Sequence, residues 1–267
     1  MRLRGSTVLL TGATGGLGRA LVGALHTQGA QLVLSGRRAD ALAELAGRFG
    51  ARTIVADLSR RADTEQLAAQ AAGVDVLIAN AALPASGRLL DLAQAEIDVM
   101  LEVDLCAPVA LARALAPGMA ARGSGHIVLI SSLAGKAATP ASSIYSAAKF
   151  GLRGFAHGAR ADLRGSGVGV SVVMPGFIRE AGMFADTGVK LPRGVGTSSP
   201  EQVAAAVIGA IEHNRAEVSV APLAVRAGAS LAAVAPSVAA SLQTLMGAGR
   251  IASVLSERQR GKRPPSR

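Results

Sequence analysis

The chain has 267 residues, half of them hydrophobic and only 2% aromatic, with 28 Lys and Arg against 18 Asp and Glu. Such a chain is long and apolar enough for one α/β domain, and its composition excludes a disordered protein. The net charge of +10 would suit nucleic acid or an anionic membrane, but there is no basic stripe interleaved with aromatics and no zinc-ligand spacing, so we predict no nucleic-acid partner and no metal site.

Residues 6–10 form the first predicted strand, whose apolar run is too short for a signal peptide, so we expect a cytoplasmic protein. A glycine-rich turn follows and leads into an amphipathic helix that ends at Gly29. Glycines let a backbone approach a pyrophosphate, which the free N–H groups of a helix N-terminus can bind; a plain strand-to-helix turn is the alternative. The predicted cofactor residues of this turn are Gly12, Thr14, Gly15, Gly16, Leu17 and Gly18.

The second predicted strand, residues 31–35, is followed by Gly36, Arg37 and Arg38. Dinucleotide-binding folds that prefer NAD often place an acid here to bind the ribose 2′-hydroxyl. This chain has glycine and arginine instead, and a guanidinium pairs well with a 2′-phosphate. We therefore predict NADP(H) as the preferred cofactor, with NAD(H) still possible and a solvated arginine pair as the alternative.

The third and fourth predicted strands, residues 53–56 and 74–79, each end in a small polar segment. After the third come Asp57 and Leu58, where the carboxylate either accepts from an adenine amino group or caps the helix that begins near Arg60. After the fourth come Asn80, Ala81 and Ala82, which are small enough for the backbone to pass close to a cofactor.

The next part of the chain carries the predicted chemistry. Helical segments span 89–121 with an expected break at Pro108, and a fifth strand, 126–131, leads to Ser132. On the following helix, 143–164, the only tyrosine and a lysine are four residues apart, at Tyr145 and Lys149, and so share one face. An ammonium beside a phenol lowers a pKa that is normally about 10, so we predict an acid/base tyrosine, with the Ser132 hydroxyl holding the same substrate oxygen.

A sixth strand, 168–174, and a seventh, 217–220, complete the pattern. Alternating strands and helices predict a Rossmann-like, doubly wound parallel sheet in a single domain, with helices on both faces. Ligands bind at the carboxyl ends of the strands in such sheets, where all of these residues fall.

Together, these residues resemble the short-chain dehydrogenase/reductase family over about residues 5–180. The glycine spacing, Gly12-x-x-x-Gly16-x-Gly18, matches the short form of the family, although Gly12-x-x-Gly15-x-x-Gly18 also fits the extended form. The resemblance implies that Ser132, Tyr145 and Lys149 are catalytic. It also implies cofactor contacts from Asp57, the Asn80–Ala82 segment, Tyr145, Lys149, Pro175, Gly176 and Ile178.

The chain departs from the family pattern at Asp104, where the family usually has an asparagine that holds a water in the proton relay. We place Asp104 with the catalytic residues because it stands at the position of that asparagine. Aspartate accepts hydrogen bonds but cannot donate as an amide does, so we expect an altered relay or slower catalysis. A second departure is Glu180, where a threonine is frequent. These departures motivate an alternative function, a catalytically weak or inactive NADP(H)-binding regulatory or scaffold protein.

We expect a catalytic domain over residues 1–223 with a lid at 177–198, a helical extension at 224–257 packed on it, and a basic flexible tail at 258–267. The uncharged stretch 227–249 is poor in large apolar residues, so we expect no membrane span and at most peripheral membrane contact. The predicted function is an NADPH-dependent carbonyl reductase, or alcohol dehydrogenase, that transfers hydride between nicotinamide and a hydrophobic ketone or aldehyde. The resemblance implies a homodimer or homotetramer.

Overall fold

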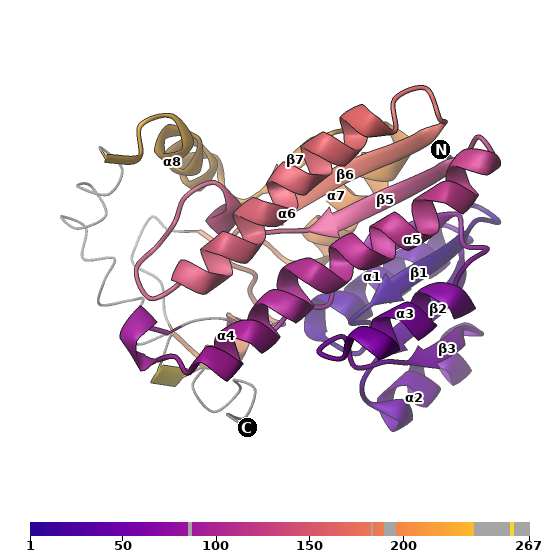
Figure 1. Cartoon of the computed structure of the whole chain (residues 1–267), viewed down its shortest axis with the longest axis horizontal. Coiled ribbons are helices and arrows are strands. Elements are labelled where there is room, and N and C mark those ends of the chain that lie inside the picture. The colour runs from indigo at the N-terminus through magenta and orange to yellow at the C-terminus, as the bar shows by residue number, and fades with distance from the viewer. Residues whose placement is uncertain (85–86, 183, 190–195, 238–256, 259–267) are drawn as a thin grey trace.

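The computed structural model describes residues 1–84, 87–182, 184–189, 196–237 and 257–258 (Figure 1). Its centre is a seven-stranded parallel sheet in the order β3-β2-β1-β4-β5-β6-β7, so the predicted fold class is confirmed. The strand order reverses between β1 and β4, which opens a crevice at their carboxyl ends. The strands are β1 (Thr7–Thr11), β2 (Gln31–Gly36), β3 (Arg52–Val55), β4 (Val76–Ala79), β5 (Gly125–Ile130), β6 (Val168–Pro175) and β7 (Glu217–Val220).

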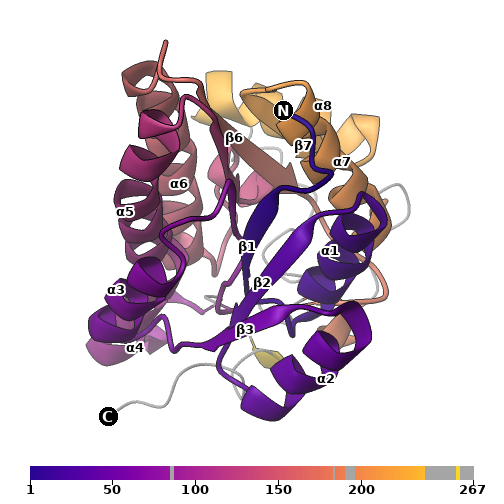
Figure 2. The same cartoon turned by 90° about the vertical axis from the view of Figure 1, so that its right-hand side faces the viewer.

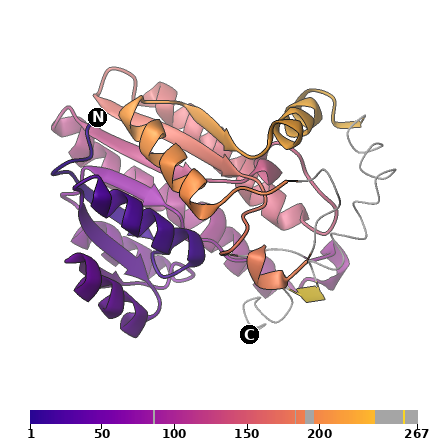
Figure 3. The same cartoon turned by 180° about the vertical axis from the view of Figure 1, so that it is seen from behind.

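Helices cover both faces of the sheet, as Figure 2 shows edge-on. One face carries α1 (Gly16–Thr27), α2 (Ala39–Phe49) and α7 (Pro200–Glu212), which lie nearest the viewer in Figure 3. The other face carries α3 (Arg61–Gln70), α4 (Gln94–Leu101), α5 (Ala107–Ala121) and α6 (Ser143–Asp162).

Side chains alternate along each central strand and therefore feed two separate cores. On β1, Leu9 packs into the core under α3, α5 and α6, whereas Val8 and Leu10 pack into the core under α1 and α7. All three are fully buried, as is expected for a parallel sheet covered on both faces. This packing fixes the ends of the strands, and with them the positions of the residues that follow.

The expected helix break at Pro108 is wrong in position. A short 3₁₀ turn, η1 (Leu89–Asp91), and α4 come first, and the irregularity is a π-helical turn, η2 (Glu102–Cys106), that runs directly into α5. Pro108 lies in the first turn of α5, directly after the π-helical turn. The π turn instead directs Asp104 into the interior, where it is fully buried.

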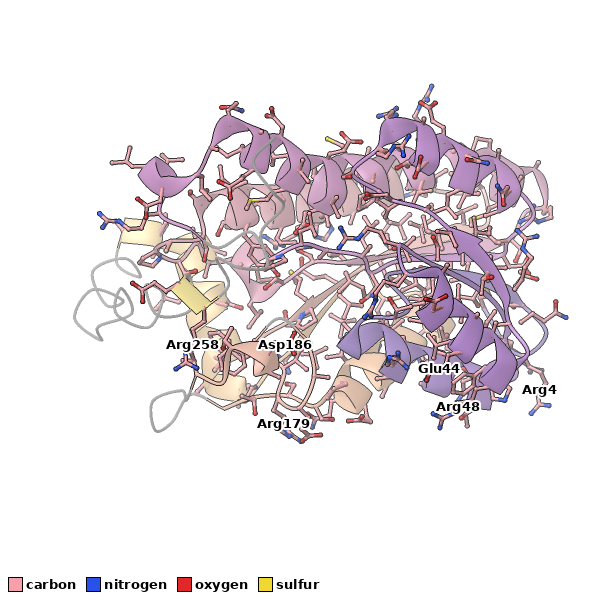
Figure 4. All side chains as sticks on the ribbon, turned by 90° about the horizontal axis from the view of Figure 1, so that it is seen from below. Arg4, Glu44, Arg48, Arg179, Asp186 and Arg258 are labelled. Atoms are coloured by element: carbon pink, nitrogen blue, oxygen red, sulfur yellow. The ribbon has the colours of Figure 1, made fainter. Side chains whose placement is uncertain are left out.

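The described part of the C-terminal extension contains α8 (Leu223–Val234), which packs through Val225, Ala229 and Ala232. Arg258 donates from Nη1 to the Thr187 carbonyl oxygen at 2.9 Å, and Figure 4 shows Arg258 on the same side of the molecule as Asp186. The rest of the predicted extension and tail, 238–256 and 259–267, lies outside the described residues. Among those that are described, no helix is long and apolar enough to cross a membrane.

A charged cluster fastens the edge strand β7 to α6. The Glu217 carboxylate lies 2.5 Å from Lys136 Nζ, 2.6 Å from Arg153 Nε and 3.0 Å from His157 Nε2. Partial burial alone would raise the pKa of Glu217, but hydrogen bonds from Arg153, Lys136 and His157 lower it from 4.5 to about 2. The folded state therefore binds this proton more weakly than the unfolded chain does.

We expect Glu217→Gln to lower the free energy of unfolding at pH 7 by roughly 2–3 kcal/mol, as the lowered pKa implies. The difference between variant and parent should be complete above pH 4.5 and should vanish as the pH falls to about 2, since the carboxylate is then protonated. Urea denaturation across this range measures it. Glu65→Gln, which breaks an exposed pair with Arg61, is the control and should change stability by less than about 1 kcal/mol. Equal midpoints for parent and Glu217→Gln at pH 7 would contradict the assignment.

Candidate active site

The glycine turn between β1 and α1 is crowded by backbone on several sides. Gly12 has φ +65°, and a Cβ there would lie 2.8 Å from Ala81 Cα. A Cβ on Gly18 would lie 2.2 Å from the Gly12 carbonyl oxygen, and one on Gly16 would lie 2.6 Å from the Gly182 amide nitrogen. Because real Cβ atoms do not approach so closely, these positions require glycine. The turn therefore presents bare backbone and the open N-terminus of α1 to the crevice.

Hydrogen bonds hold the segment after β4 against this turn. The Thr11 hydroxyl accepts from the backbone N–H groups of Asn80 and Ala81, at 3.0 and 3.1 Å. The Asn80 side-chain amide donates to the carbonyl oxygens of Thr11 and Gly12, at 3.0 and 3.2 Å. In this structure Asn80 thus shapes the glycine turn, and Ala81 and Ala82 are the members of the segment that line the cleft beside it.

The cleft has a volume of about 270 Å³ and lies at the carboxyl ends of β1, β2, β3 and β4. Its lining combines residues from four predicted segments that are far apart in the sequence: Thr14, Gly15, Gly36, Arg37, Arg38, Asp57, Leu58, Ala81 and Ala82. Sequence reasoning missed Ser35, Ala56, Leu83 and Val103, which also line it. Ser35, Ala56 and Leu83 are each next in sequence to a predicted residue, so extending each predicted segment by one residue would have included them.

The two arginines after β2 have different roles. Arg38 Nη2 donates to the Thr14 carbonyl oxygen at 2.9 Å, which joins the start of α2 to the glycine turn. Arg37 lines the same cleft and is exposed, so its guanidinium can meet an anion that enters. A Cβ on Gly36 would lie 3.5 Å from Thr14 Oγ1, an ordinary contact, so Gly36 is not required by crowding.

Asp57 lines the cleft but does not cap α3. Its Oδ1 accepts from the backbone N–H and the hydroxyl of Ser59, at 3.1 and 2.9 Å, and the N-cap position of α3 belongs to Arg60. The capping alternative for Asp57 is therefore wrong. The carboxylate is held at the end of β3 by this local turn, where it remains part of the cleft wall.

Ser132, Tyr145 and Lys149 converge at the end of β5 and the start of α6. Lys149 is almost fully buried; its Nζ lies 5.5 Å from the centre of the Tyr145 ring, 3.4 Å from the Ile130 carbonyl oxygen and 3.6 Å from Asp104 Oδ2. The neighbouring Ser131 hydroxyl donates to the Lys149 carbonyl oxygen at 2.8 Å and so ties α6 to β5. Gly135 allows this approach, since a Cβ there would lie 2.6 Å from that same oxygen.

The pKa of Tyr145 is raised, contrary to the expectation from the lysine alone. Removal of the phenol from water is the largest cause, and the negative charge of Asp104 raises the pKa further. Lys149 lowers it, as does a hydrogen bond with the Ser132 side chain. The sequence predicted the effect of Lys149 correctly but gave no measure of burial, which here outweighs it.

The residues after β6 follow at the same end of the sheet. The Ser132 hydroxyl donates to the Pro175 carbonyl oxygen at 3.4 Å, and Gly176 packs against Ala221. Ile178 pairs with Ser198 in an isolated β-bridge. Glu180 has φ +69° and is exposed, with its carboxylate 2.8 Å from Arg179 Nε. Of the predicted lid, 183 and 190–195 lie outside the described residues.

The described residues also line a cavity that is larger than the cleft beside the glycine turn. This cavity of about 650 Å³ lies beside the end of α6 and the start of β6, at the opposite end of the strands. Its lining includes Arg160, Arg164, Gly167 and Asn214 and none of the predicted site residues. Arg160 is already bonded to Val170 and Asn214. The convergence of side chains that can transfer a proton, and not the cavity volume, marks the smaller cleft as the candidate site.

Comparison with known proteins shows the family to which the chain belongs. The short chain dehydrogenase family model matches residues 6–190, from β1 into the segment after β6. The chain belongs to the short-chain dehydrogenase/reductase family. It is accordingly an NAD(P)-dependent dehydrogenase/reductase. It is 40% identical to ketoacyl reductase HetN of Nostoc sp. over 82% of this chain and 79% of that protein. It is also 40% identical to dehydrogenase/reductase SDR family member 7B of Mus musculus, over 66% of this chain and 58% of the mouse protein.

Solved structures of the family share the fold. A short-chain dehydrogenase from Streptomyces avermitilis superposes with a TM-score of 0.76 at 26% identity, covering 94% of this chain and 99% of that one. A short-chain dehydrogenase from Sphingobium yanoikuyae in complex with NADPH superposes with a TM-score of 0.74 at 27% identity, covering 91% of this chain and 95% of that one. The sheet and its covering helices are therefore those of a short-chain dehydrogenase.

Proposed function

We propose that this enzyme is an NADPH-dependent carbonyl reductase, or alcohol dehydrogenase in the reverse direction. The observation that carries the proposal is the convergence of Ser132, Tyr145 and Lys149 next to the cleft. Asp104 links these three residues to the cleft. Its carboxylate contacts Lys149 and accepts from the Leu83 N–H, and Leu83 lines the cleft. An acid/base group beside a cleft at the carboxyl ends of the strands suits transfer of a proton and a hydride to one C=O group.

The residues present fit a dinucleotide. Crowding leaves room for backbone alone at Gly12 and Gly18, and the N-terminus of α1 offers unpaired N–H groups to a pyrophosphate. The cleft walls around Asp57, Leu58 and Ala81 would hold the adenosine end. When bound, the cofactor supplies the hydride, which goes to the carbonyl carbon of the substrate.

The protein's own residues handle the proton. The hydroxyls of Ser132 and Tyr145 would both bond the substrate carbonyl oxygen, and Tyr145 gives its proton to that oxygen as the C–H bond forms. Lys149 stabilises the resulting phenolate, since its ammonium lies over the same ring. In the oxidative direction Tyr145 takes the proton back from the alcohol.

Cofactor preference provides the first test. We expect NADPH to bind the purified protein more tightly than NADH, and Arg37→Ala to weaken NADPH binding by about 10-fold or more, because it removes a charge-assisted contact with the 2′-phosphate. Fluorescence titration with each nucleotide measures both constants. Arg48→Ala, at an exposed arginine at the other end of α2, is the control and should leave them unchanged. Tighter NADH binding would overturn the choice of cofactor but not the enzyme.

The substrate we propose is a hydrophobic ketone or aldehyde. One support is the relative called a ketoacyl reductase, and another is the pair of aromatic rings in the described segment after β6, where the ring centres of Phe177 and Phe184 lie 4.8 Å apart. A screen of NADPH oxidation with ketoacyl thioesters, aliphatic ketones and polar sugar ketones tests it. A sole response to the polar ketones would contradict the hydrophobic class.

Three further proposals concern the lid, the oligomeric state and the cellular compartment. We propose that residues 177–198 form a lid over the substrate, that the enzyme is a homodimer or homotetramer, and that it is cytoplasmic. The scaffold alternative gains no support from the two relatives named above, which are called reductases.

A further inference from the structure

The fully buried carboxylate of Asp104 is the feature of the site that the proposed reaction does not require. It lies in the π-helical turn η2, and its Oδ1 accepts from the Leu83 N–H at 2.7 Å. Its Oδ2 has no hydrogen-bond partner and lies 3.6 Å from the Lys149 ammonium. Burying a carboxylate oxygen without a hydrogen bond costs free energy, and the nearby ammonium offsets part of that cost.

We infer that Asp104 is a positioning residue that holds the Lys149 ammonium in a buried ion pair and thereby makes the Tyr145 phenol harder to deprotonate. Lys149 lies between two groups that compete for its charge, the Asp104 carboxylate at 3.6 Å and the Tyr145 ring at 5.5 Å. In a weakly polar interior, the negative charge of Asp104 partly offsets the positive charge of Lys149. The ammonium therefore stabilises a Tyr145 phenolate less than it would alone. An amide at this position would leave the ammonium to Tyr145 alone.

Among the described residues, the groups that face Asp104 and Lys149 are few. From α6 they are Lys149 and Tyr145, and from β5 the Ile130 carbonyl oxygen accepts from Lys149 Nζ. Of the described residues after β4, Leu83 contributes its neutral N–H to Asp104. On its own turn the nearest carboxylate is Glu102, two residues earlier, which interacts with Cys106. Burial raises the pKa of Asp104, and the charge of Lys149 and the hydrogen bond from the Leu83 N–H oppose this.

The chain allows a direct test, because Tyr145 is its only tyrosine and it contains no tryptophan. Ultraviolet absorbance of the phenolate, followed from pH 7 upwards in the cofactor-free protein, reports the ionisation of this one side chain. We expect Asp104→Asn to lower the pKa of Tyr145 by about 1 unit or more, a tenfold change in its acidity, because a nearby negative charge is lost. Glu102→Gln, the same carboxylate-to-amide change in the same turn, should leave the titration unshifted.

The consequence for reaction direction rests on the proposed function. With Asp104 present, the protonated tyrosine needed for carbonyl reduction persists to higher pH, so Asp104→Asn should move the alkaline limb of kcat/KM for reduction to lower pH and speed alcohol oxidation at neutral pH. An unshifted Tyr145 titration in Asp104→Asn overturns the inference and leaves the proposed function intact. A shifted titration in a protein that reduces no carbonyl compound supports the inference and overturns the proposed function.

Discussion

Replacing Tyr145 by phenylalanine is expected to lower kcat/KM for NADPH-dependent reduction by about 10²- to 10⁴-fold, the range typical of losing a general acid. The variant keeps the ring over which Lys149 lies, and it removes only the hydroxyl that would give a proton to the substrate oxygen. Steady-state kinetics with a substrate found in the carbonyl screen measure the loss. NADPH binding, followed by fluorescence, should change less than kcat, because phenylalanine keeps the ring and Lys149 above it.

The serines at the end of β5 provide a matched pair for the same experiment. Ser132→Ala removes a hydroxyl proposed to bind the substrate oxygen and should lower kcat strongly. Ser131→Ala removes a hydroxyl one residue earlier that bonds the Lys149 backbone, so it should lower stability by about 1 kcal/mol with a much smaller effect on kcat. If Tyr145→Phe turned over substrate as fast as the parent, Tyr145 would not be the acid.

The second large effect is expected at the glycine turn. Gly18→Ala places a methyl group 2.2 Å from the Gly12 carbonyl oxygen and 2.8 Å from the Ala13 carbonyl carbon, and both are backbone atoms that cannot rotate away. Relieving such an overlap costs about 3 kcal/mol, which corresponds to a loss of NADPH affinity of roughly 100-fold if the turn is displaced. Nucleotide titration measures this, and thermal unfolding shows whether the variant still folds.

The same helix supplies the control. Gly23 also lies in α1, and a Cβ there would meet no atom within 4 Å. Gly23→Ala should therefore leave NADPH binding unchanged and stabilise the fold by about 0.5–1 kcal/mol, because alanine favours the helix. Equal NADPH affinity in Gly18→Ala and Gly23→Ala would show that the glycine turn does not bind the cofactor.

The sequence by itself determined the fold and the end of the sheet at which the site lies. Apolar strands alternating with amphipathic helices permit few arrangements other than a doubly wound parallel sheet, and parallel strands bring their carboxyl ends to one edge. That is why Gly12, Asp57, Ala81 and Ser132, far apart in the chain, could be assigned to one region. Helical spacing likewise placed Tyr145 and Lys149 on one face of α6.

Only the tertiary structure decided how these groups act on one another. The π turn that buries Asp104 against Lys149, the burial that outweighs the lysine at Tyr145, and the bond from Arg38 to the glycine turn each depend on contacts between distant segments. The energy of a charge depends on its exposure to water and on the groups within a few ångströms of it. A residue pattern carries neither quantity, so the sequence could name the candidate site residues but not the balance of charge among them.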